Sequence, residues 1–373
     1  MNKNYAWLVV CISLIIVTGV IAFGFRKPAV YVAIVSSLTG TLAENGKDTA
    51  NGAKMAFDEL NLDSNAIIHY QLFDDQGDPK TAVAIANQIC QDSRYIAVVG
   101  HLTSGCMSAA AEVYAKNGMP VAMPVPTNPR ITQLGYQSLF RIPPTDDDQA
   151  PFLALYLLSK DPIAPVAIVN DLTSYGLGFA NAFRDKFRSA GGNIVAFEGA
   201  KKESRDYKTL IAKLKELHPK YVVIGATYDM GAPFVRQMKE MGLKATAIAG
   251  DGCYGSAFLQ QAGNAGEGSI VSFIAPDRGV SPKAVKFFKE YERKYGKVVS
   301  YAPLGYDAAE VIINAIEKAT DKSRKGIVSE IKKQGFFVDG VTGRIEFNNN
   351  GDNKNKNISI YVVSNNKFKL LNQ

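Results

Sequence analysis

Residues 30–35 (VYVAIV), 46–60 (GKDTANGAKMAFDEL) and 67–73 (IIHYQLF) decide the fold. The first and last of these have the length of strands, and the middle one places apolar Ala53, Ala56 and Leu60 along one helix face. The same alternation predicts helices at 80–92 and 104–116 and strands at 96–99 and 121–123. Strands that alternate with helices are typical of a parallel sheet covered by helices on both faces, so the sequence predicts an α/β domain.

A polar stretch with two prolines, residues 141–148 (RIPPTDDD), breaks this pattern. The alternation then resumes, so a second α/β unit is expected to begin near Asp146. Its predicted elements are strands at 166–169, 194–197, 221–225 and 245–249 and helices at 175–189, 207–217 and 231–241. Long helices at 282–295 and 301–318 and strand-like runs at 344–347 and 358–363 follow. Two such units leave a crevice between them, which is a common place for a small ligand.

The N-terminus carries an uncharged run from Asn4 to Phe25 between Lys3 and Arg26. This pattern predicts a secretory signal peptide, residues 1–24, that is cleaved after the Gly of Ala22-Phe-Gly24. The mature protein would then be periplasmic. The run is also long enough to cross a bilayer, so an uncleaved N-terminal membrane anchor is the alternative.

The composition excludes several classes of function. The chain of 373 residues has a formal net charge of +7, but its basic residues are interleaved with 35 acidic ones, so no nucleic-acid partner is expected. No CxxC or HxxxH spacing occurs, and we expect neither a metal site nor a cofactor. Outside the leader, Cys90, Cys106 and Cys253 leave at least one free thiol or an intermolecular bond. The sequence does not decide whether any pair of them forms a disulfide.

Catalytic motifs are missing as well. No G-x-S-x-G occurs, and the stretch Gly40–Asp48 has one residue too many between its glycines for a phosphate loop, so a turn before a helix is expected there. An enzyme is therefore not predicted. Ser104, Thr127 and Asp251 remain, each just after a predicted strand. Each could be a helix cap or could offer a polar group to a ligand.

Several stretches resemble a known family in their order and spacing. They are VSSLTG (35–40), NGAKMAFD (51–58), DDQGDP (74–79), VGHLTS (99–104), PVPTNP (124–129), DLTSYG (171–176), GDG (250–252) and SYAPLGY (300–306). Together they resemble the periplasmic leucine/isoleucine/valine-binding proteins of branched-chain amino-acid ABC transporters. The resemblance covers the whole chain after the leader.

This resemblance implies a type I periplasmic-binding-protein fold, an α/β fold with two doubly wound parallel-sheet lobes joined by three crossovers. Lobe one would comprise residues 27–144 plus 276–354, and lobe two residues 145–275 plus 355–373. The implied function is that of a monomeric, extracytoplasmic solute-binding protein. It would close around a small amino acid, branched-chain or otherwise aliphatic, and deliver it to an ABC transporter permease. A membrane-tethered, ligand-sensing ectodomain is the alternative.

The resemblance also implies a binding site. Ser104, Val125 and Thr127 would hold the ligand carboxylate, and Asp251 the ammonium. The remaining implied ligand contacts are Tyr175, Tyr301 and Leu102.

Three departures from the family affect this implied site. Asn45 and Thr227 stand where the branched-chain binders carry tyrosines, and Asp251 is shorter than their glutamate. Gly77 and Thr103 replace a pair of disulfide cysteines. The side-chain pocket is therefore altered, and a polar amino acid or a small amide is an alternative ligand.

Overall fold

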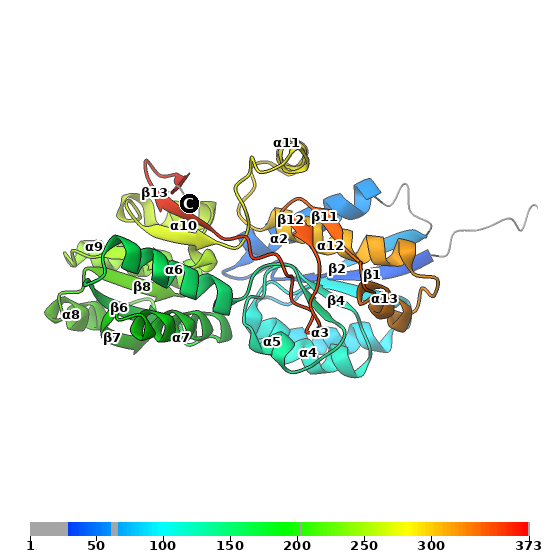
Figure 1. Cartoon of the computed structure of the whole chain (residues 1–373), viewed down its shortest axis with the longest axis horizontal. Coiled ribbons are helices and arrows are strands. Elements are labelled where there is room, and N and C mark those ends of the chain that lie inside the picture. The colour runs from blue at the N-terminus through cyan, green and yellow to red at the C-terminus, as the bar shows by residue number, and fades with distance from the viewer. Residues whose placement is uncertain (1–28, 61–65, 202, 372–373) are drawn as a thin grey trace, which may run out of the picture.

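The computed structural model describes residues 29–60, 66–201 and 203–371. The predicted leader lies outside these residues, as do the last two residues of predicted lobe two. Figure 1 shows two lobes side by side along the long axis of the molecule. Within the described part, no helix combines the length and the apolar character that crossing a membrane requires.

The first lobe is built on a five-stranded parallel sheet in the order β2-β1-β3-β4-β5. Its strands are β1 (Ala29–Ser36), β2 (Ile67–Asp74), β3 (Tyr95–Gly100), β4 (Val121–Met123) and β5 (Leu139–Arg141). Successive side chains of a strand point to opposite faces, so Val32 and Ile34 enter one core and Ala33 and Val35 another. Helices α2 (Ala43–Leu60) and α12 (Ala302–Lys318) cover the first face, and α3 (Pro79–Gln91) and α4 (Ser104–Lys116) the second. Two shorter helices, α5 (Arg130–Gln133) and α13 (Arg324–Ile331), complete this lobe.

The second lobe repeats this plan. Its strands β6 (Pro165–Asn170), β7 (Asn193–Gly199), β8 (Tyr221–Gly225), β9 (Thr246–Ala249) and β10 (Ile270–Phe273) are parallel, and β13 (Ser359–Val363) and β14 (Phe368–Leu370) add an antiparallel edge. One face is covered by α6 (Asp146–Lys160) and α7 (Ser174–Ser189), the other by α8 (Lys208–Glu216), α9 (Tyr228–Glu240) and α10 (Ser256–Ala262). The 3₁₀ turns are η1 (Asp251–Cys253) and η2 (Gly263–Ala265).

The chain passes between the two sheets three times, after β5, after β10 and after the hairpin of β11 (Val338–Gly340) and β12 (Gly343–Ile345). Helix α11 (Pro282–Tyr295) follows the second passage. The parallel strands of the second sheet run in the order β7-β6-β8-β9-β10, so both lobes have the doubly wound order 2-1-3-4-5. In such sheets, ligands bind at the carboxyl ends of the strands where the order reverses. That point lies between β1 and β3 in one lobe and between β6 and β8 in the other.

The stretch 141–148, where the predicted alternation of strands and helices breaks, contains the start of α6. Thr145 and Asp148 form a capping box in which the Asp148 carboxylate accepts from the Thr145 amide at 2.9 Å. Acidic residues in a first helical turn also suit the helix dipole, so Asp146–Asp148 favour a helix start here. The Gly40–Asp48 stretch is a turn followed by α2, as expected.

The three cysteines of the described residues, Cys90, Cys106 and Cys253, are buried and form no disulfide. In this same part of the chain, no group of three or more histidine, cysteine or acidic side chains is arranged to hold a metal ion.

Candidate ligand-binding site

The nine residues predicted from the sequence lie around one cavity of about 40 Å³ between the lobes. Lobe one contributes residues that follow β1, β3 and β4 or precede α12, and lobe two contributes residues that follow β6, β8 and β9. The cavity therefore lies at the strand ends that flank both reversals of strand order. From lobe one come Asn45, Leu102, Ser104, Val125, Thr127 and Tyr301, and from lobe two Tyr175, Thr227 and Asp251. Sequence reasoning missed Leu42, Thr103 and Gly252, although each lies within the quoted motifs or beside them.

Ser104 begins α4, but the helix cap is its neighbour Thr103, whose hydroxyl accepts from the amide of Cys106 at 3.1 Å. The Ser104 hydroxyl oxygen accepts instead from the amides of Thr127 and Asn128, at 3.2 and 3.3 Å. A serine hydroxyl has two acceptor lone pairs and one donor hydrogen. With both lone pairs engaged, the hydroxyl hydrogen is available to an anion in the cavity.

A buried network beneath the cavity holds the loop between β3 and α4. Nδ1 of His101 lies 2.8 Å from Asp75, and its Nε2 lies 3.1 Å from the Tyr114 hydroxyl. Burial alone would raise the pKa of Asp75, but hydrogen bonds from His101, Gly77 and Ser37 hold it below the usual value. None of the three network residues lines the cavity, so the network positions Leu102 and Ser104 and does not contact a ligand there.

Asp251 is the only acidic residue that lines the cavity among the described residues, and its side chain is buried. Its carboxylate accepts from the hydroxyl of Tyr175 at 3.1 Å and from that of Tyr301 at 3.0 Å. Burial raises the pKa of Asp251 to about 6, although both tyrosines act to lower it. No lysine or arginine of the described chain lines the cavity. The carboxylate is therefore a buried negative charge that a cationic ligand group would balance.

Tyr301 belongs to lobe one, and a carboxylate in α2 fixes its position. The Asp48 carboxylate accepts from three backbone amides just before and at the start of α12, those of Val299 (3.0 Å), Ser300 (3.0 Å) and Ala302 (2.8 Å). It also accepts from the Tyr291 hydroxyl at 2.8 Å. These bonds satisfy orphan amides at the start of α12. Sequence reasoning considered Asp48 only as a misfit in a phosphate loop, because its partners lie some 250 residues away in the chain.

A second buried acid lies close to this site. Asp146 begins α6, and its amide donates to the carbonyl of Thr127 at 2.9 Å. Burial raises the pKa of Asp146 well above its usual value, and the charge of Asp251 raises it further.

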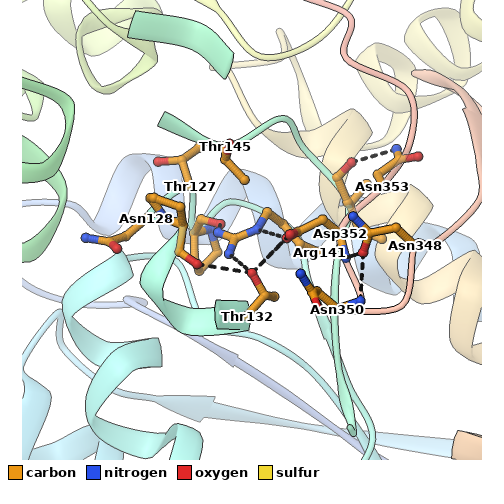
Figure 2. Close-up of polar contacts among 12 residues, drawn as sticks. Thr127, Asn128, Thr132, Arg141, Thr145, Asn348, Asn350, Asp352 and Asn353 are labelled. Carbon is orange, nitrogen blue, oxygen red and sulfur yellow. Dashed lines mark hydrogen bonds and ion pairs between the residues drawn. The ribbon is translucent and has the colours of Figure 1, made fainter. Parts of the chain in front are cut away.

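The loop that carries Val125 and Thr127 is tied to the crossovers by a buried ion pair, which Figure 2 shows. The Arg141 guanidinium pairs with Asp352 at 2.8 Å and donates to the carbonyl of Pro126 at 2.6 Å and to the hydroxyl of Thr132 at 2.9 Å. Thr132 in turn donates to Asp352 at 2.9 Å. Because Arg141 ends β5 and Asp352 follows the hairpin of β11 and β12, the pair holds the first and third crossovers beside this loop.

The lobes also bond to each other directly. The Thr41 hydroxyl donates to the Asp229 carboxylate at 2.7 Å. The backbone carbonyl of Thr41 accepts from the Tyr228 hydroxyl, also at 2.7 Å. On another side of the cleft, the side-chain carboxamide nitrogen of Asn128 donates to the carbonyl of Ser174 at 2.6 Å. These contacts describe a closed arrangement in which both lobes enclose the cavity.

The model of a family described as periplasmic binding protein matches residues 29–367. A leucine-specific-binding protein of Salmonella typhimurium is 30% identical over 356 residues, which cover 93% of this chain and 95% of that protein. The structure of a leucine-binding protein from Thermotoga maritima covers 92% of this chain and 98% of its own, with a TM-score of 0.85 and 25% identity. A branched-chain amino acid transporter substrate-binding protein from Streptococcus pneumoniae, in complex with isoleucine, covers 92% and 99%, with a TM-score of 0.84 and 25% identity.

Proposed function

The chain belongs to the periplasmic binding protein family, among its leucine/isoleucine/valine-binding proteins, and from this premise we propose that it captures one small α-amino acid between its lobes. The predicted type I periplasmic-binding-protein fold is confirmed by the same matches. The observation that carries the proposal is the division of the cavity's polar groups. Hydrogen-bond donors for an anion lie on lobe one, and a buried carboxylate for a cation lies on lobe two.

A zwitterion suits this division because its two ends need opposite partners. Its carboxylate takes the hydroxyl hydrogen of Ser104 and the donors of the Val125–Thr127 loop. Its ammonium takes Asp251, while Tyr175, Tyr301 and Leu102 pack around the carbon skeleton. Since the two partners lie on different lobes, a ligand that binds both favours the closed form over the open one.

We propose the wider function, the lobe boundaries and the fate of the leader by analogy with the family. The protein is extracytoplasmic, acts as a monomer, delivers its ligand to an ABC transporter permease and catalyses no reaction. The lobes are residues 27–144 plus 276–354 and residues 145–275 plus 355–373, and residues 1–24 are a cleaved signal peptide. Mass spectrometry of the protein from the cell envelope should find an N-terminus at Phe25. An intact leader in the membrane fraction would favour the tethered sensor instead.

A thermal-shift screen of the standard amino acids, followed by calorimetry on those that stabilise the protein, tests the proposed ligand class. At least one α-amino acid should raise the melting temperature, and Asp251→Asn should weaken its binding strongly. If no amino acid binds, or if Asp251→Asn binds as tightly as the wild type, the protein does not hold an α-amino acid in this way.

A further inference from the structure

Asn45 is a polar side chain in the cavity wall that has no hydrogen-bond partner among the described residues. It lies in the first turn of α2, is 3% exposed and lines the cavity. Its carboxamide oxygen is buried without a hydrogen bond, and its amide nitrogen bonds to no residue that the structure describes. We propose that Asn45 selects an amino acid whose short side chain carries a hydroxyl or a carboxamide, in preference to leucine or valine. This inference rests on the proposed function and deepens it.

Asn45 lies on a different element of the fold from the groups assigned to the ligand backbone. It follows β1, whereas Ser104 and Thr127 follow β3 and β4, and Asp251 follows β9 in the other lobe. An α-amino acid has three substituents besides hydrogen on its α-carbon. With the carboxylate and the ammonium held elsewhere, the third substituent is the one left to face Asn45.

The rest of the wall is compatible with a short polar side chain. The Thr227 hydroxyl donates to Asp229 at 2.5 Å, so its oxygen can still accept a hydrogen bond from a ligand. The Thr227 oxygen and the Asn45 carboxamide therefore offer two polar groups to a ligand side chain in this cavity.

Closing the lobes over an aliphatic side chain would leave the Asn45 carboxamide buried and unpaired. A ligand hydroxyl or carboxamide would pair with it, whichever way the amide is turned. Because an unmet hydrogen bond of a buried group is costly, we expect the matching ligand to bind about 5- to 150-fold more tightly than its apolar isostere.

Calorimetry with two isosteric pairs tests this, threonine against valine and asparagine against leucine. Threonine differs from valine by a hydroxyl in place of a methyl group, so size is constant within that pair. In the wild type, the polar member of at least one pair should bind 5- to 150-fold more tightly. Asn45→Leu and Asn45→Ala should remove this preference, and Asn45→Leu should favour the apolar member. Alanine and leucine are both good helix formers, so α2 should tolerate either change.

Asn87→Ala is the matched control, since Asn87 is an exposed asparagine on α3 outside the cavity. It should keep the wild-type preference. If valine and leucine bind the wild type as tightly as threonine and asparagine, or if the Asn45 variants weaken all four ligands equally, the assignment of Asn45 is wrong while the amino-acid site stands. If none of the four ligands nor any other amino acid binds, the proposed function fails and this inference fails with it.

Discussion

Replacing Asp251 by asparagine should let the ligand-free protein close more readily and at the same time weaken its hold on the ligand. In the closed form, burial raises the pKa of Asp251 from its usual 3.8 to about 6. Each unit of pKa shift corresponds to 1.36 kcal/mol. At neutral pH, an ionised Asp251 therefore destabilises the closed form by about 3 kcal/mol relative to a form in which its pKa is ordinary. Separating the lobes removes Tyr301 from the carboxylate and admits water, so the open form avoids this cost.

Asparagine keeps the shape of the side chain and removes the charge. We therefore expect Asp251→Asn to shift the ligand-free equilibrium toward closure by about 150-fold at pH 7.5. Ligand affinity should fall by about 2–5 kcal/mol, because the ammonium loses its buried partner. Since the pKa of this acid is raised, the cost is present above pH 6 and disappears as the pH falls from about 6 toward 4. Ligand-free wild type should accordingly close on acidification, and the variant should not respond.

Spin labels on the two lobes can measure this closure. Lys116→Cys at the end of α4 and Arg188→Cys at the end of α7 are both exposed sites, and the native cysteines of the described residues are buried. The interlabel distance in ligand-free Asp251→Asn should approach that of the liganded wild type. Asp185→Asn, the same change on the exposed surface of lobe two, should behave like wild type. If Asp251→Asn stays as open as wild type at pH 7.5, the buried charge does not hold the lobes apart.

Three further results are expected. Ser104→Ala should reduce ligand affinity by about 1–2 kcal/mol in calorimetry, because it removes one donor while neighbouring donors remain; an unchanged affinity would remove Ser104 from the site. Asp352→Ala should lower the free energy of unfolding, measured in urea, by about 3–5 kcal/mol, since it leaves Arg141 buried without its carboxylate partner. Glu112→Ala, which breaks the exposed pair with Lys116, should change this free energy little. Ligand affinity should be constant above pH 7 and fall as the pH drops from about 6 toward 4, the range in which ligand-free Asp251 becomes protonated. An equal loss in Asp251→Asn would assign the titration to another group.

Most of the parallel strands could be predicted from the sequence because a short, continuous apolar run is typical of a strand buried in a parallel sheet. The runs at 30–35, 67–73 and 96–99 lie within β1, β2 and β3. Strand β5 was missed because its last residue, Arg141, is charged and begins the stretch with two prolines that breaks the pattern. Strand β10 and helix α10 were missed in a region without clear periodicity. Helix α6 was not predicted, because its acidic first turn lies in the stretch 141–148 that was interpreted as a break, although Ala150, Leu153 and Leu157 form an apolar face.

The candidate site could be predicted as far as it depends on local order along the chain. Residues just after a parallel strand gather at one sheet edge, so the strand ends indicated Ser104, Thr127 and Asp251 before any contact was known. The groups that position them could not be found in this way. Asp48 bonds to a residue 251 positions away and Arg141 to one 211 positions away, and no local pattern marks such partners.

Under the proposed function, the placement of the cavity would make recognition and closure one process in this protein. Each lobe has its reversal of strand order at the cleft, so each supplies half of a site and neither encloses a ligand alone. The half on lobe two carries a carboxylate that is costly to bury, and the half on lobe one carries the tyrosine and hydroxyls that bury it. A ligand that meets only one half gains nothing from closure, because the buried charge of Asp251 then stays unbalanced. Under the proposed function, the charge that binds the ammonium would thus also be the charge that keeps the empty cleft open.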